Sequence, residues 1–229
     1  RFLAEERGVE RIAVIHADDI YGQYFADRAN ELAAEFGYTV VGTQPLLRNP
    51  VDATSEMSAL QEGQPDVVIM ALYPAGAKKV VEAKAELAWD VGLLSSGPLT
   101  DEQYLNTDSG AAEGTLGFCH YPDPNESDEP GIVEYRRLMA EHFSGEELNR
   151  YSLYGYVFGM LVVEGLERAG PELTRDRFLE GMESIRDWDS GGILPAVGFS
   201  ESDHHAQDAG FICELVERRF RALTGWIAP

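Results

Sequence analysis

Asp18, Asp19 and Tyr21 are the first side chains in the sequence whose types and spacing suit binding or catalysis. They follow residues 12–15, a short apolar run typical of a strand buried on both faces of a parallel sheet. Either carboxylate can accept the free N–H groups at the start of the helix predicted next. This βα unit therefore carries three polar groups to the carboxyl edge of a sheet, where open α/β sheets bind ligands.

Two more loops lie at the carboxyl ends of predicted strands. Tyr73 and Pro74 follow the apolar run at residues 66–71, and the turn at residues 97–101 follows a short strand at residues 91–94. A tyrosine combines an apolar ring with one hydroxyl, which suits contact with a small organic ligand. Each tyrosine taken alone is better explained by ordinary packing, but three loops at one edge favour a site. The candidate ligand-binding residues are Asp19, Tyr21, Tyr73, Pro74, Leu99, Thr100 and Asp101.

One catalytic interpretation of the paired carboxylates fails on the sequence itself. A phospho-receiver domain would add to Asp18 and Asp19 a third carboxylate at the end of its third strand. The best matching strand here ends in Ala71 and is followed by Leu72, so that carboxylate is missing.

The remaining signals for catalysis are also weak. Asp203, His204 and His205 resemble a metal cluster, but adjacent residues rarely converge on one ion, so we expect a solvated hairpin loop. The sequence contains no nucleophile elbow, Walker loop, GxGxxG or HExxH motif. We predict no catalytic residue, metal or cofactor. An α/β enzyme that uses Asp18, Asp19 or the 203–205 loop is the alternative.

The elements that must position these loops alternate between strand and helix patterns. Strands are predicted at residues 12–15, 38–43, 66–71, 91–94 and 114–119, and helices at residues 21–36, 52–60 and 77–88, with a loop at 45–50. This alternation predicts an α/β fold of three layers, in which a parallel sheet lies between flanking helices.

The pattern changes after residues 121–130, which are polar, contain three prolines and predict a crossing between domains. Three helices follow at residues 132–143, 152–169 and 174–185, the last with Thr174 as its N-cap, and strands return at 193–199, 210–216 and 220–227. The helix at 152–169 is apolar nearly all round and must be covered on most sides, yet no sheet is predicted beside it.

Composition excludes two classes of partner. Of the 229 residues, 40 are acidic and 18 are basic, and the net charge of −22 would repel nucleic acid and anionic membranes. No apolar run approaches the roughly 20 residues of a membrane-spanning helix. The sequence begins abruptly at Arg1, which suggests a processed or truncated chain. Cys119 and Cys213 are either small buried hydrophobes or, in an oxidising compartment, a disulfide between adjacent strands.

Taken together, the sequence resembles a type I periplasmic solute-binding protein of the branched-chain amino acid (Leu/Ile/Val) class. The matching stretches are IAVIHADDIYGQ, GQPDVVIMALYPAGAKKVVEAKAE, GAAEGTLGF, the tyrosine-rich helix that ends in GLERAG, and FSESDHHAQDAGFICELVERRFRALTGW. Each motif is loose, but together they follow the family's order over essentially the whole chain.

The resemblance implies two lobes, each a parallel sheet with helices on both faces, joined by three crossings. Residues 1–120 and 191–229 would form the second lobe, and residues 121–190 would supply a crossing and helices of the first. The first lobe's sheet would be absent from this sequence. An N-terminal segment or a second chain would then complete the fold, and a sheet under residues 150–185 would contradict this expectation.

The resemblance further implies the extracytoplasmic binding component of an ABC importer, which closes two lobes on a small ligand and meets a membrane permease. Its location would be periplasmic or extracellular, free or lipid-anchored. The alternative within binding proteins is the ligand-sensing domain of a receptor or regulator.

The resemblance also implies which residues of this sequence stand at the family's ligand-binding positions. Tyr21 matches the family's ligand-contacting tyrosine, and Tyr73 or Leu72 falls at a second aromatic position. Leu99 stands where amino-acid binders place a carboxylate for the ligand's ammonium group. Because an apolar residue cannot offset the desolvation of an ammonium group, either Asp101 takes that role or the ligand is an aromatic carboxylate or a short amide.

Overall fold

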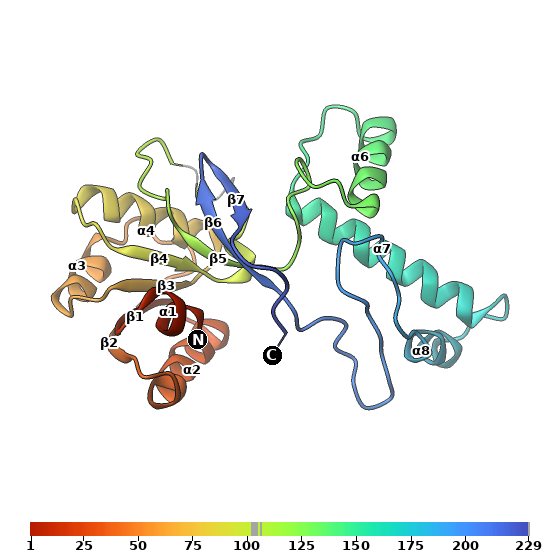
Figure 1. Ribbon diagram of the computed structural model, residues 1–229, viewed down its shortest axis with the longest axis horizontal. Helices are drawn as coiled ribbons and strands as arrows, with labels where there is room; N and C mark the ends of the chain where they lie inside the picture. Colours follow the sequence, from red (N-terminus) through yellow and green to blue (C-terminus); the bar gives the residue numbers. More distant parts are fainter. Residues whose placement is uncertain (102–104, 106, 229) are drawn as a thin grey trace. The chain divides into compact units, whose positions relative to one another are not determined.

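A computed structural model of the chain describes residues 1–101, 105 and 107–228. Its backbone contacts separate two compact units, which are coloured along the sequence in Figure 1. Unit 1 comprises Arg1–Phe118 and Ile212–Leu223, and unit 2 comprises Cys119–Phe211 and the tail from Thr224.

Unit 1 is built on a sheet with the strand order β2-β1-β3-β4-β5-β6-β7. The strands are β1 (Arg11–Ala17), β2 (Thr39–Leu46), β3 (Val67–Ala71), β4 (Gly92–Ser95), β5 (Leu116–Cys119), β6 (Phe211–Val216) and β7 (Arg219–Ala222). Strands β1 to β5 pair in parallel, whereas β6 and β7 form an antiparallel hairpin. The predicted parallel α/β sheet is therefore confirmed.

Helices cover both faces of this sheet. They are α1 (Phe2–Arg7), α2 (Ile20–Phe36), α3 (Thr54–Glu62) and α4 (Pro74–Glu86), with a short 3-10 turn, η1, at Gly97–Leu99. The chain moves from β1 to β2 in one direction along the sheet, and from β2 to β3 to β4 in the other. Right-handed crossovers therefore place α2 on one face and the neighbouring helices α3 and α4 on the other (Figure 1).

Two boundaries near the candidate site differ from the prediction for local reasons. Strand β2 continues through Pro45 to Leu46, where a loop was predicted, because β2 is an edge strand and tolerates a residue without an N–H. Helix α4 begins at Pro74 rather than at residue 77, because proline suits the first helical position, whose N–H would have no partner in the helix.

Unit 2 contains the helices α6 (Pro130–His142), α7 (Arg150–Ala169) and α8 (Arg175–Glu183), and no strand is described between β5 and β6. Thr174 caps α8 as predicted, since its side chain accepts a hydrogen bond from the N–H of Arg177. The buried core of the unit consists of Tyr121, Ile132, Tyr135, Leu153, Val157, Leu161, Ile193, Leu194 and Val197.

The prediction of a strand at residues 193–199 is wrong. Only an isolated bridge between Trp188 and Val197 forms there. The apolar residues of the run pack into the core of unit 2, so residues 191–211 group with that unit, whereas the sequence analysis placed them with residues 1–120. Burial in an irregular segment gives the same apolar run as burial in a strand.

Helix α7 is covered on one side. Leu153, Val157, Leu161 and Gly165 recur every four residues and are buried. On other sides Phe158 is 58 % exposed and Val163 is 53 % exposed. Within the described residues, no strand lies in unit 2 to cover this second apolar surface.

The sequence did not decide whether the two cysteines form a disulfide, and in the structure they do. Cys119 ends β5 and Cys213 lies in the neighbouring strand β6, and both are fully buried. Both are disulfide-bonded, and because the sequence holds no other cysteine, they are bonded to each other.

Candidate functional site

The carboxyl ends of four neighbouring strands in unit 1 carry a connected group of polar and aromatic side chains. Strands β2, β1, β3 and β4 are adjacent and parallel, so the residues that follow them meet at one edge of the sheet. Four contacts join Arg48, Tyr73, Asp19, Tyr21 and Ser96 into one cluster, which we call the edge cluster.

Asp19 is both the N-cap of α2 and a member of the edge cluster. Its Oδ1 accepts a hydrogen bond from the Gly22 N–H at 3.0 Å, and its Oδ2 accepts one from the Tyr73 hydroxyl at 3.0 Å. These two bonds and the nearby charge of Arg48 lower the pKa of Asp19 below its ordinary value of 3.8. The Asp19 side chain is therefore ionised at neutral pH.

The first turn of α2 packs directly on the end of β1. A Cβ atom at Gly22 would lie 2.0 Å from the carbonyl oxygen of Ala17, so this position has no room for a side chain. The close approach fixes the direction in which α2 leaves the strand, and hence where Asp19 and Tyr21 lie.

Tyr21 is half-buried and contacts two other rings. Its ring centroid lies 5.2 Å from that of Phe25 and 5.5 Å from that of Tyr73, and its hydroxyl donates a hydrogen bond to Ser96 Oγ at 3.0 Å. Burial raises the pKa of Tyr21, so the hydroxyl stays neutral. The ring is thus held in one position.

Tyr73 connects the two halves of the edge cluster. Its hydroxyl donates to Asp19, which raises the pKa of Tyr73, and its ring stands beside that of Tyr21. The guanidinium carbon of Arg48 lies 4.4 Å from the Tyr73 ring centroid, a cation–π contact. The edge cluster thus offers ring faces, hydroxyls, one carboxylate and one guanidinium.

The structure brings some of the predicted site residues together and not others. Asp19, Tyr21 and Tyr73 meet, and Pro74 is half-buried directly after Tyr73. The remaining three are buried within unit 1, with exposed fractions of 0 % for Leu99 and 2 % for Thr100 and Asp101.

The 3-10 turn η1 explains this burial. It turns residues 99–101 inward, and the Thr100 hydroxyl donates to the Gly97 carbonyl at 2.7 Å. Leu99, which the resemblance had placed at an ammonium-binding position, is a core residue in this structure.

Two members of the edge cluster were missed by the sequence analysis. Arg48 follows β2 and Ser96 follows β4, so the rule that selected Tyr21 and Tyr73 could have selected both. Arg48 lay in the loop predicted at residues 45–50, because the strand before it was ended too early. Ser96 fell between the strand predicted at residues 91–94 and the turn at residues 97–101.

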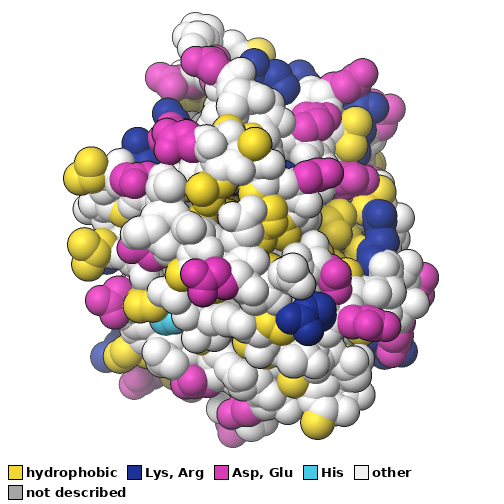
Figure 2. Space-filling model, turned by 90° about the vertical axis from the view of Figure 1, so that its left-hand side faces the viewer, with side chains coloured by type: hydrophobic (Ala, Val, Ile, Leu, Met, Phe, Trp, Pro, Cys, Tyr) yellow, Lys and Arg dark blue, Asp and Glu magenta, His cyan; other side chains and the backbone are white. Residues whose placement is uncertain are grey.

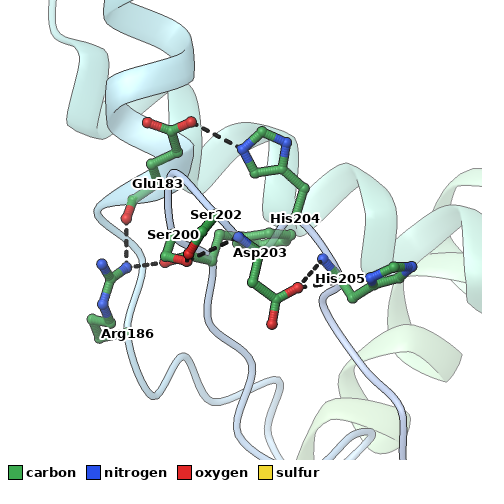
Figure 3. Close-up of polar contacts among 8 residues, drawn as sticks. Glu183, Arg186, Ser200, Ser202, Asp203, His204 and His205 are labelled. Carbon is green, nitrogen blue, oxygen red and sulfur yellow. Dashed lines mark hydrogen bonds and ion pairs between the residues drawn. The ribbon is translucent and has the colours of Figure 1, made fainter.

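The loop with Asp203, His204 and His205 is fastened to α8, as Figure 3 shows. His204 Nε2 lies 2.9 Å from Glu183 Oε1, and Asp203 Oδ1 accepts the His205 N–H at 2.9 Å. Arg186 donates to the carbonyl of Phe199 just before this loop. Across the described residues, no group of three or more His, Cys, Asp or Glu side chains could hold a metal ion.

Acidic side chains are scattered over the molecular face in Figure 2 rather than gathered into one patch. None of the helices in the described part of the chain combines the length and apolar character needed to cross a membrane.

A sequence model of a periplasmic binding protein family matches residues 1–219, nearly the whole chain. The chain belongs to the periplasmic binding protein family. The resemblance found in the sequence is thereby confirmed, and unit 1 has the α/β fold of a type I periplasmic binding protein lobe. No curated protein sequence matches this family member.

Solved structures share the fold of this periplasmic binding protein. A branched chain amino acid ABC transporter protein from Thermus thermophilus with bound valine has a TM-score of 0.87 at 16 % identity, over 100 % of this chain and 63 % of that one. A fatty acid ABC transporter substrate-binding protein from Thermomonospora curvata has a TM-score of 0.87 at 19 % identity, over 100 % of this chain and 60 % of that one. An extracellular ligand-binding receptor from Rhodopseudomonas palustris has a TM-score of 0.79 at 15 % identity, over 96 % of this chain and 65 % of that one.

The present chain therefore spans less than two thirds of the length of these structural relatives. At such identities the likeness concerns the fold alone.

Proposed function

We propose that the chain is part of an extracytoplasmic solute-binding protein that serves an ABC importer. The edge cluster carries this proposal, because it gathers Tyr21, Tyr73, Asp19 and Ser96 where open α/β sheets bind ligands. Ring faces beside a few fixed polar groups are typical of sites for small organic molecules. Amino acids, aromatic carboxylates and amides are the candidate ligands.

The proposed mechanism is closure of two lobes on the ligand. A ligand that contacts both lobes binds the closed state more tightly than the open one, and so shifts the population toward it. Closure then creates the surface that a membrane permease recognises. No covalent step and no cofactor are part of this proposal, and Asp19 acts as a fixed acceptor rather than as a base.

A segment outside these 229 residues, or a second chain, completes the first lobe in this proposal. The exposed apolar side of α7, with Phe158 and Val163, supports it, since such a surface is normally covered. The length of the relatives supports it as well.

A periplasmic or extracellular location belongs to the same proposal, either free or lipid-anchored. Family membership supports it, and so does the disulfide between Cys119 and Cys213, because disulfides persist in oxidising compartments. The second candidate function is the ligand-sensing domain of a receptor, which the similar fold of the Rhodopseudomonas palustris receptor supports.

Thermal unfolding of the full-length gene product tests the binding proposal. The panel consists of leucine, phenylalanine, benzoate and short amides, each added separately. A ligand at about 100 times its dissociation constant adds roughly 2.7 kcal/mol to the free energy of unfolding, which raises the unfolding temperature measurably. If no member of the panel raises it, a role in binding these compounds is contradicted.

A further inference from the structure

We infer that Arg48 binds an anionic group of the solute, so that the edge cluster selects a carboxylate. This inference rests on the proposed function, because it assigns a ligand class to the same site. It concerns a residue that none of the motifs in the sequence singled out.

The position of Arg48 is the first observation. It lies two residues after the end of β2, is exposed, and its guanidinium carbon lies 4.4 Å from the centroid of the Tyr73 ring. The ring on which it rests also contacts Tyr21 and donates to Asp19. Arg48 therefore lies at the edge cluster itself rather than on a remote part of the surface.

The unused hydrogen-bonding capacity of Arg48 is the second observation. Among the described residues, no carboxylate or carbonyl accepts a hydrogen bond from its guanidinium. The guanidinium instead makes a cation–π contact with the Tyr73 ring. Arg137, in contrast, binds both Glu134 and Glu141, and Arg136 donates to two backbone carbonyls. The charge of Arg48 acts on Asp19, but no acceptor in the described part of the chain occupies its N–H groups, so they are available to a ligand.

The chemistry of the guanidinium names the ligand group. Its planar fork matches a carboxylate through two parallel N–H···O bonds. Stacking on Tyr73 restricts the side chain before a ligand arrives, so less conformational entropy is lost on binding. Asp18 and Asp19 would repel a ligand carboxylate, so within the edge cluster Arg48 is the group that attracts one.

Isothermal titration calorimetry of the full-length protein tests the inference with matched probes. Leucine is compared with leucine amide, and benzoate with benzamide, so that each pair differs at the carboxylate. The variants are Arg48→Gln, which removes the charge, and Arg48→Lys, which keeps the charge but lacks the fork. Arg7→Gln is the matched control, because Arg7 is another exposed arginine over a ring, 5.6 Å from the Phe2 centroid and before β1.

We expect the wild type to prefer the carboxylate of at least one pair. Arg48→Gln should weaken that carboxylate about tenfold or more, Arg48→Lys should weaken it less, and Arg7→Gln should leave it unchanged. Carboxylate binding that Arg48→Gln leaves unchanged overturns the role of Arg48, and so does a preference for the amides. Either result still leaves the proposed solute-binding function standing. If none of the four probes binds, the inference and the candidate ligand classes of the proposed function fail together.

Discussion

At the scale of single residues, Asp19 links the fold to the site. The same carboxylate caps α2 and orients the Tyr73 hydroxyl, so the strand-to-helix turn and the edge cluster depend on one side chain. Loss of this side chain removes an acceptor from a helix N–H and a fixed partner from Tyr73.

Asp19→Ala should lower the free energy of unfolding at neutral pH and less so in acid. The pKa of Asp19 is depressed in the folded protein, so its contribution is present above the ordinary value of 3.8 and is lost as the pH falls through the folded-state pKa. Urea denaturation of wild type and variant at about pH 7 and about pH 3 measures the two differences.

Asp18→Ala is the matched control for this prediction. It removes the same charge one residue earlier, from an exposed side chain. A destabilisation by Asp19→Ala that is equal at both pH values, or that Asp18→Ala reproduces, would contradict the account of Asp19.

The sequence was sufficient to predict that Asp19, Tyr21 and Tyr73 lie close together, because strand ends fix where residues lie along a parallel sheet. It was not sufficient for Leu99 and Asp101, because a single 3-10 turn decides which side chains point inward, and that turn leaves no periodic pattern. Arg48 was not identified because the end of the strand before it was predicted too early, although the rule for strand ends would have selected it.

At the scale of elements, the junction between β1 and α2 positions the site. Gly22→Ala should destabilise the protein by about 1–3 kcal/mol, since the new methyl group would overlap the backbone of Ala17. Urea denaturation measures the change. Gln23→Ala, at an exposed position of the same helix turn, should change stability by less than about 0.5 kcal/mol. Equal effects of the two substitutions would refute the close packing of this junction.

Helix α7 provides the second test at this scale. If another segment covers it in the full-length protein, Phe158→Ala should lower the free energy of unfolding by about 3 kcal/mol or more. Tyr24→Ala is the control, because Tyr24 is 64 % exposed on α2 and Phe158 is 58 % exposed on α7. Chemical denaturation of the full-length variants measures both. A loss for Phe158→Ala no larger than that for Tyr24→Ala would mean that the surface stays open.

The elements themselves were predictable where their patterns were periodic. Helix α2 and strands β1 and β3 follow the predicted ranges closely, because burial on one or both faces leaves a repeated signature. Residues 193–199 were predicted wrongly because an apolar run buried in an irregular segment has the same composition as a strand.

At the scale of the whole molecule, the net charge of −22 governs the response to salt. Like charges lie closer together in the compact state than in the unfolded chain, so screening favours folding. The free energy of unfolding, measured in urea, should rise as sodium chloride increases from about 0.05 M to about 1 M. Potassium chloride should raise the free energy of unfolding by the same amount, because the effect is charge screening. A flat or falling dependence would show that charge repulsion does not limit stability.

The measurement that tests the central claim most directly is the ligand affinity of Tyr21→Ala in the full-length protein. Calorimetry would use the tightest-binding compound of the panel, with Tyr24→Ala as an exposed tyrosine of the same helix outside the edge cluster. The account predicts that Tyr21→Ala, while still folding cooperatively, loses about tenfold or more in affinity and that Tyr24→Ala does not. An unchanged affinity in Tyr21→Ala would contradict a solute site at this edge of the sheet.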